Sequence, residues 1–240
     1  MSDDTKPDDP DSVSVVASLA EPTRRALYEL VASSGDWVSR DAAAGALGLE
    51  RGTAAHHLDR LVADGLLVVD YQRLSGRTGP GAGRPSKLYR RAAREFGVSL
   101  PPRSYDLAGR MLAAAADRAR LGAADIDTTL SDAAVAEGHE LAEKIRARQK
   151  ASGARSVAAR RVVALEVLAD YGFEPHEERD GTVLLRNCPF HELAQAHTDL
   201  ICGMNHCLMQ SAADELGNLG FDPRLEPQEG YCCVKLHPAS

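Results

Sequence analysis

The chain has 240 residues, of which 44% are hydrophobic and 26% charged, the composition of an ordinary globular protein. It has no run of 18 or more apolar residues, which argues against a membrane-spanning helix and a membrane partner. The N-terminal stretch "MSDDTKPDDPDS" carries five Asp and one Lys and lacks the basic and apolar parts of a secretory signal. We therefore expect a cytoplasmic protein in which residues 1–13 form a disordered acidic tail.

Charge is distributed unevenly behind the net value of −7. Residues 71–95 hold seven Lys or Arg and one acidic residue, whereas residues 174–240 hold eleven Asp or Glu and four Lys or Arg. The basic segment suits an anionic partner such as nucleic acid, and the acidic segment does not.

The first third of the chain has the pattern of three helices followed by a β-hairpin. Apolar residues recur at three- and four-residue spacing over Pro22–Ser33, with a proline in the first turn. Ser39 can cap a second helix over residues 40–47, and a third helix is expected over residues 50–64.

Two strands, over residues 66–74 and 87–92, flank the glycine-rich stretch "SGRTGPGAGRPS". The order helix, helix, tight turn, helix, hairpin is that of a winged helix-turn-helix, which we assign to residues 14–98. The other interpretation is a solvated basic hairpin on an unrelated domain.

The third helix of this layout would lie in the major groove of double-stranded DNA. Arg and His can donate to base edges, Thr and Ala can contact a thymine methyl group, and hairpin cations can contact phosphates or a narrow minor groove. One of the two histidines could instead pack against the protein or contact a phosphate. The candidate DNA-contacting residues are Arg51, Thr53, Ala54, His56, His57 and Arg60 on the helix and Arg77, Arg84 and Lys87 on the hairpin.

These segments resemble a known family. "ALGLERGTAAHHLDRLVADGLL" followed by "RTGPGAGRPSKLYRRA" resembles the winged-helix segment of bacterial ArsR-like regulators, over residues 15–95. The part "GPGAGRPSKLYRR" is similar to the branch that contains the SufR-type iron–sulfur repressors of cluster-assembly operons. The resemblance implies a DNA-binding transcriptional repressor.

The middle of the chain is rich in Ala, Leu, Arg and Glu and predicts one or two helices, over residues 105–121 and 130–148. Because palindromic operators are read by twofold dimers, we interpret residues 99–152 as a helical homodimerisation region. The alternative is that these helices pack only within one chain. The expected apolar stripes are Leu107, Met111, Leu112 and Ala115 on the first helix and Val135, His139, Leu141 and Ile145 on the second.

The last third predicts a small α+β sensor domain over residues 153–240, so that the whole chain is α+β. Residues 157–171 form an amphipathic helix, and a strand, a turn at Asp180-Gly181 and a second strand follow. A long helix is expected over residues 190–216, with one or two strands over residues 222–236.

All five cysteines lie in the last 53 positions. In the reducing cytosol, clustered cysteines are more often ligands or redox groups than disulfides. Cys188 precedes the long helix and Cys202 lies in its middle. Cys207 is rotated by about 140° from Cys202, whereas His206 shares the face of Cys202.

Strand alternation places Cys232 on the apolar face of the last strand and turns Cys233 outward. Several functions remain open on this pattern, which contains no CxxC pair: an iron–sulfur cluster, a zinc site with Cys and His ligands, or a thiol switch at Cys202 or Cys232. Each cysteine taken alone could also be a small buried hydrophobe.

The cysteine-containing segments extend the resemblance. "NCPFHELAQAHTDLICGMN" with the later "GYCCVKL" resembles the C-terminal sensor of the SufR-type branch. This implies an iron–sulfur cluster, expected to be [4Fe–4S], with Cys188, Cys202 and Cys232 among its ligands. The fourth cysteine of that family lies in the loop after the long helix, and that loop has none here. The candidates for the fourth position are Cys207, Cys233, His206 and His191, or the position is open.

No P-loop, GxGxxG or GxSxG pattern is present, so we expect no enzyme and no small-molecule substrate. The expected function is a homodimeric repressor whose affinity for its operator depends on the cluster, and the resemblance adds cluster-assembly genes as targets. The first alternative is a zinc-bound or thiol-based regulator with the same DNA-binding domain. The second, less favoured, is an enzyme with a catalytic cysteine. The only local feature favouring the enzyme is His206 beside Cys207.

Overall fold

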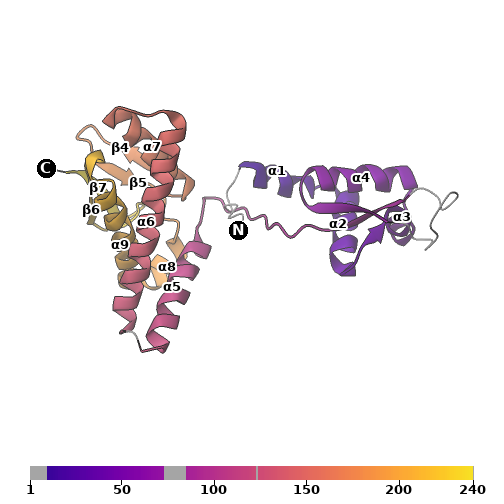
Figure 1. The fold of residues 1–240 in the computed structure, drawn as a ribbon, viewed down its shortest axis with the longest axis horizontal. Helices are drawn as coiled ribbons and strands as arrows, with labels where there is room; N and C mark the ends of the chain where they lie inside the picture. The colour runs from indigo at the N-terminus through magenta and orange to yellow at the C-terminus, as the bar shows by residue number, and fades with distance from the viewer. Residues whose placement is uncertain (1–9, 73–84, 123, 240) are drawn as a thin grey trace. The chain divides into compact units, whose positions relative to one another are not determined.

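A computed structural model of the protein describes residues 10–72, 85–122 and 124–239 (Figure 1). The fold is α+β, as predicted, with helices and two small antiparallel sheets in the described residues. The chain divides into two compact units, Met1–Val98 and Ser99–Ser240. None of the helices in the described part of the chain combines the length and the apolar character needed to cross a lipid bilayer.

The first unit contains the three predicted helices and both predicted strands, together with a short first helix and a short strand that were not predicted. Its sheet has the order β1-β3-β2, and Val69 pairs with Tyr89 across the β2–β3 ladder. The elements are α1 (Pro10–Ser18), α2 (Pro22–Ser34), β1 (Val38–Ser39), α3 (Arg40–Leu47), α4 (Arg51–Ala63), β2 (Leu67–Gln72) and β3 (Ser86–Arg91).

Local capping explains where these helices begin and end. The Glu21 carboxylate accepts hydrogen bonds from the first amides of α2, and the Ser39 hydroxyl accepts one from Ala42 N at 3.1 Å at the start of α3. Gly48 ends α3 with φ of 62°, a left-handed conformation that glycine adopts without steric strain. The predicted cap at Ser39 and the helix over residues 40–47 are confirmed.

The prediction of a disordered tail over residues 1–13 is wrong for residues 10–13, because α1 begins at Pro10. Val15 is buried in the core of the first unit, and the Ser18 hydroxyl donates to Asp64 at 2.6 Å. Tertiary contacts therefore hold a helix whose local sequence gives only a weak helical signal. The rest of the predicted tail, residues 1–9, lies outside the described residues.

The second unit pairs long helices with a sheet of order β4-β5-β7-β6. The helix expected over residues 190–216 is divided at His197, whose φ of −140° and ψ of 58° are not helical. Cys232 and Cys233 precede the last strand and do not lie within it. The elements are α5 (Tyr105–Arg120), α6 (Ile126–Ser152), α7 (Val157–Asp170), β4 (Pro175–Glu177), β5 (Val183–Leu185), α8 (His191–Ala196), α9 (Thr198–Glu215), a 3₁₀ turn (Gly217–Leu219), β6 (Phe221–Leu225) and β7 (Val234–Pro238).

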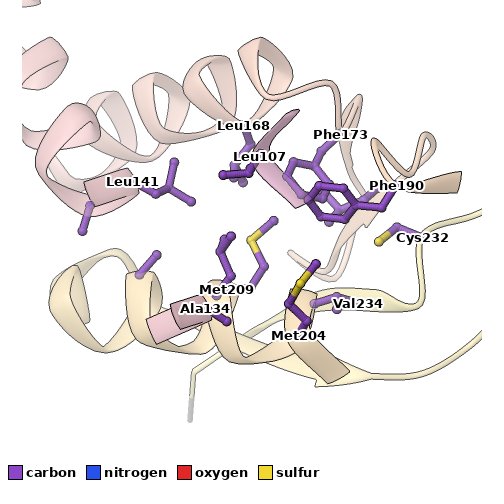
Figure 2. Packing of buried hydrophobic residues seen from close by; sticks show 14 of the residues in the cluster. Leu107, Ala134, Leu141, Leu168, Phe173, Phe190, Met204, Met209, Cys232 and Val234 are labelled. Carbon is purple, nitrogen blue, oxygen red and sulfur yellow. The ribbon is translucent and has the colours of Figure 1, made fainter. Parts of the chain in front are cut away.

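One hydrophobic core serves the whole second unit, so residues 99–152 share it with residues 153–240. Helices α6 and α9 pack so closely that a Cβ atom on Gly138 would lie 2.5 Å from the Leu208 carbonyl oxygen. The Ser211 hydroxyl donates to Val135 O at 2.9 Å across the same contact. Figure 2 shows this core through side chains that include Leu107, Ala134, Leu141, Leu168, Phe173, Phe190, Met204, Met209, Cys232 and Val234.

The expected stripe on α6 is only partly correct. Leu141 and Ile145 are buried, but Val135 and His139 are exposed. The four positions do not follow a 3.6-residue period, because residues 139 and 141 lie about 200° apart around a helix. On α5, the expected stripe faces the core.

Candidate functional site

Four of the five cysteines meet in the second unit as two pairs. Cys202 on α9 and Cys233 before β7 have their sulfur atoms 2.8 Å apart. The thiol of Cys232 donates a hydrogen bond to Cys188, which lies in the loop after β5. The charge of Cys188 also acts on Cys202, so the two pairs are neighbours. All of these thiols are free of disulfides.

The fold brings these segments together through the core and the sheet. Cys232 N donates to Leu185 O at 2.8 Å, which ties the segment before β7 to the end of β5. Phe190 is fully buried, its ring packs edge-to-face on Phe173, and it anchors the turn that follows Cys188. Cys232 is 1% exposed and belongs to the core itself (Figure 2).

A buried amide lies beside the thiols and was not predicted from the sequence. Asn205, which is 2% exposed, donates from Nδ2 to Cys232 Sγ at 3.3 Å. Its Oδ1 has no hydrogen-bond partner in the described part of the chain. The available signal was its place on α9 three residues after Cys202, on the side of the helix that faces the core.

Cys188, Cys202 and Cys232 do not share one protonation behaviour. The hydrogen bond from Cys232, with the Phe190 amide and the Arg103 charge, lowers the pKa of Cys188 to about 7 against the opposing effect of burial. Burial and the contact with Cys233 raise the pKa of Cys202 to about 12, and the pKa of Cys232 is also raised. At neutral pH Cys188 is therefore a partly formed thiolate while Cys202 and Cys232 stay protonated, and a metal would displace their protons.

The spacing of the thiols determines how they could hold a metal. In residues 10–72, 85–122 and 124–239, no group of three or more His, Cys, Asp or Glu side chains is arranged around one metal ion. The Cys202 and Cys233 sulfurs, 2.8 Å apart, lie closer than the separation of about 3.8 Å between two thiolates on one tetrahedral zinc or iron at metal–sulfur bonds of about 2.3 Å. The donor set is soft and entirely sulfur, which suits iron–sulfur chemistry or a thiol–disulfide switch.

The residues considered for the fourth ligand position lie in different surroundings, and one of them contacts another cysteine. Cys233, which was expected to face outward, turns toward Cys202, because it precedes β7 and strand alternation does not apply to it. His206 Nε2 lies 3.1 Å from Pro223 O, and His191 Nε2 lies 2.9 Å from the Gln195 amide. Cys207 and His206 line an open groove of about 550 Å³ between α6 and α9.

Comparisons with known proteins add nothing to this geometry. No protein-family model, curated protein or solved structure matches the chain. What the sites can do follows from their own residues.

The outer face of α4 in the first unit carries most of the helix residues expected to contact DNA. Arg51, Thr53, His56 and Arg60 are exposed. The prediction for Ala54 is wrong, because this residue lies on the inner face of α4 and is fully buried. His57 is largely covered and lies 3.5 Å from the Glu21 carboxylate, so it contributes to packing more than to the exposed face. The predicted contacts Arg77 and Arg84 lie outside the described residues.

Ion pairs hold the cations of this face in place. Lys87 Nζ lies 2.5 Å from Asp59 Oδ1, and the Tyr89 hydroxyl donates to the same oxygen at 2.7 Å. Burial opposes ionisation of Asp59, but the hydrogen bonds from Lys87 and Tyr89 outweigh it and lower the pKa of Asp59. Arg51 pairs with Asp41 at 2.7 Å. Such exposed pairs contribute little to stability, so a phosphate can replace the carboxylate partner of a cation.

A polar pocket of about 360 Å³ adjoins this face, at the start of α3 and the end of the β2–β3 ladder where Gln72 pairs with Ser86. Arg40 lines it, and the Nε of Arg40 is buried with no hydrogen-bond partner among the described residues. Sequence reasoning missed Arg40, which was read only as the first residue of a helix. The lining residues are Ser39, Arg40, Asp41, Arg51, Tyr71, Pro85, Ser86 and Lys87.

Proposed function

We propose that this protein is a cytoplasmic, homodimeric transcriptional repressor that binds double-stranded DNA under the control of an iron–sulfur cluster. The cluster is held by Cys188, Cys202, Cys232 and Cys233. The observation that carries the proposal is the convergence of these four thiols, as two pairs, from three separate segments of the second unit. The genes of cluster assembly are the proposed targets, on the strength of the sequence resemblance.

The donor set fits an iron–sulfur cluster. A cluster takes four cysteine thiolates, and Cys188, Cys202, Cys232 and Cys233 supply that number of soft sulfur donors. When bound, it supplies a redox-active group that oxidants can destroy. Cys188 contributes a thiolate that is already half formed at neutral pH. Asn205 contributes an N–H···S hydrogen bond to Cys232, the kind of contact that orients a ligand and adjusts its basicity.

The first unit supports a winged helix-turn-helix function. Helices α3 and α4 are joined by a tight turn at Gly48, and strands β2 and β3 follow as a hairpin. In this proposal α4 enters the major groove and presents Arg51, Thr53, His56 and Arg60. Arg40 and Lys87 bind backbone phosphates beside it, which fixes the register of the helix on the duplex.

Dimerisation is proposed for the helical part of the second unit. Twofold operators need two reading helices about one turn of DNA apart, which a single chain does not supply. Exposed apolar side chains on and beside α5 and α6 support a contact there, namely Leu121, Ile126 and Val135. Sedimentation equilibrium of the full chain measures this directly, and a monomer at all accessible concentrations would contradict it.

The test begins with anaerobic purification of wild type, Cys202→Ser and Cys207→Ser. We expect a brown wild type with absorbance near 400 nm and matched iron and sulfide, a colourless Cys202→Ser, and a Cys207→Ser identical to wild type. A duplex selected from a random-sequence pool by the wild-type protein then serves as the DNA probe. Colourless wild type after anaerobic reconstitution, or a pool that yields no duplex, refutes the proposal.

A thiol switch is the second candidate, and the 2.8 Å contact between Cys202 and Cys233 favours it. In that case hydrogen peroxide takes two electrons from the pair, the two sulfurs become a disulfide, and the two thiol protons leave in the two water molecules that form. Iron-free protein would then lose two titratable thiols per chain and change its affinity for the selected duplex. Retention of all five thiols under mild peroxide would exclude this function.

A further inference from the structure

The segment through which the chain enters the second unit is fixed to the loop that carries Cys188. The second unit begins at Ser99, directly after the last residue of the first unit. Ser104 is buried and its amide donates to Pro189 O at 3.0 Å. The hydroxyl of Ser104 donates to Tyr171 O at 3.0 Å, so the entering chain is held on two sides.

Side chains reinforce this attachment in both directions. The Arg103 guanidinium donates to Asn187 Oδ1 and to Cys188 O, the latter at 3.3 Å. In return, Asn187 Nδ2 donates to Pro102 O at 2.8 Å and to Gly172 O at 2.5 Å. Asn187 is 8% exposed, so its amide has little access to water that could replace these partners.

The residues that make this attachment are the immediate sequence neighbours of Cys188. Asn187 precedes Cys188, Pro189 follows it, and the carbonyl of Cys188 itself accepts from Arg103. The positive charge of Arg103 also acts on the Cys188 sulfur. A displacement of this loop therefore changes the hydrogen bonds of residues 102–104 directly, without an intervening layer of side chains.

We propose that the contact of Arg103 with Asn187 and Cys188 transmits the state of the thiol site to the first unit. This inference rests on the proposed function and names its route of regulation. A ligand shared by Cys188 and the other three thiols fixes the loop, and the loop fixes residues 102–104. Loss of that ligand leaves the loop with weaker restraints, and residues 102–104 detach more often. The two-state element is this segment, attached or released.

A purely structural role for Arg103 makes a different prediction. It would lower the stability of the second unit by the same amount with and without the cluster, and the ratio of DNA affinities in the two states would not change. A transmitting role changes that ratio while the cluster stays bound. The ratio is therefore the decisive quantity.

The experiment compares wild type, Arg103→Met and Arg110→Met, all full length. Arg110 is an exposed arginine on α5 that pairs with Asp106, so its substitution matches the charge change without touching the loop. Each protein is titrated with the duplex selected by wild type, first with its cluster and then after removal of the cluster. Iron and sulfide analysis accompanies each titration.

We expect the two affinities of wild type and Arg110→Met to differ by about 5- to 150-fold, the usual range of coupling between sites. In Arg103→Met we expect the difference to fall below about threefold with the cluster content unchanged. A wild-type ratio in Arg103→Met overturns the inference but leaves the proposed function standing. A wild type without cluster, or without DNA binding, refutes the proposed function instead.

Hydrogen exchange of the wild-type protein gives a second readout that depends on no variant. We expect the Ser104 amide to exchange at least severalfold faster after cluster removal, because its acceptor, Pro189 O, lies next to Cys188. If peptides covering residues 186–192 change and residues 99–105 do not, the contact does not transmit and the inference is overturned. This readout decides the question if Arg103→Met fails to hold the cluster.

Discussion

The two units of this protein place their functional groups in opposite physical settings. In the first unit the candidate groups are exposed cations on α4 and the hairpin, held by surface ion pairs over a separate apolar core. In the second unit the candidate groups are thiols, and Cys232 is itself part of the core. Function and stability can therefore be changed separately in the first unit, whereas in the second they depend on the same side chains.

The largest effect is expected from Phe190→Ala. Removal of this fully buried ring costs about 3–5 kcal/mol of folding free energy and disturbs the turn after Cys188, so the thiol site is lost as well. Tyr71→Ala, an exposed aromatic on β2, costs less than about 0.5 kcal/mol. Urea unfolding followed by circular dichroism measures both changes.

Trp37, the only tryptophan of the chain, provides the control for that measurement. It lies in the first unit, so its fluorescence follows the unfolding of that unit alone. Suppose that Phe190→Ala lowers the stability seen by circular dichroism, leaves the tryptophan transition unchanged and keeps the thiol site intact. Site and core would then be separable in the second unit, which would contradict the comparison.

A smaller and more selective loss is expected from Cys233→Ser. Because the Cys233 sulfur lies against Cys202 at the edge of the core, the substitution should leave the fold intact and remove one of the four proposed ligands. We expect iron content per chain to fall by at least about tenfold, the lower end of what ligand-shell changes cause. Cys207→Ser is the matched control. Equal iron in the two variants would show that the fourth ligand is not Cys233.

In the first unit, Arg51→Met is expected to weaken binding of the selected duplex by about 1–3 kcal/mol without changing stability. Arg40→Met is expected to weaken binding to all sequences alike and to reduce the slope of log K against log salt by about 1, because it removes a phosphate contact. Fluorescence anisotropy at several salt concentrations checks both. Arg118→Met, which removes an ion pair with Asp132 between α5 and α6 of the second unit, should bind as wild type does.

The smallest effect concerns the pH dependence of Cys188. With its pKa near 7, about half of this thiol is ionised at pH 7, against roughly 3% of an ordinary thiol with a pKa of about 8.5. Folding lowers this pKa, so the thiolate stabilises the folded state at high pH, and that contribution is lost as pH falls through about 7. Mass spectrometry of iodoacetamide-treated, metal-free protein should show half-maximal alkylation of Cys188 near pH 7. A midpoint near pH 8.5 would contradict the hydrogen bond from Cys232.

Elements governed by local chemistry could be predicted from the sequence. Ser39 and Gly48 delimit α3, and the glycine-rich stretch between β2 and β3 identified them as a hairpin, because caps and turn signals depend on residues close in the chain. Helix α1 was missed because contacts of Val15 and Ser18 with distant residues hold it.

The thiol site, too, could be predicted from the sequence only in part. Cys188, Cys202 and Cys232 were expected ligands from the resemblance, but the orientation of Cys233 depends on where β7 begins, which no periodicity determined. Asn205 and Arg103 act through partners 27 and 85 residues away, respectively. Contacts over such separations follow from the tertiary fold and leave no spacing signal in the sequence.

The close approach of α6 and α9 has a mechanical consequence. Gly138 against Leu208 O and Ser211 against Val135 O leave no room for either helix to slide along the other by a residue. Shear, the usual small motion of packed helices, is therefore blocked at this contact. We therefore expect a movement of Cys202 on α9 to tilt or rotate α6 together with α9.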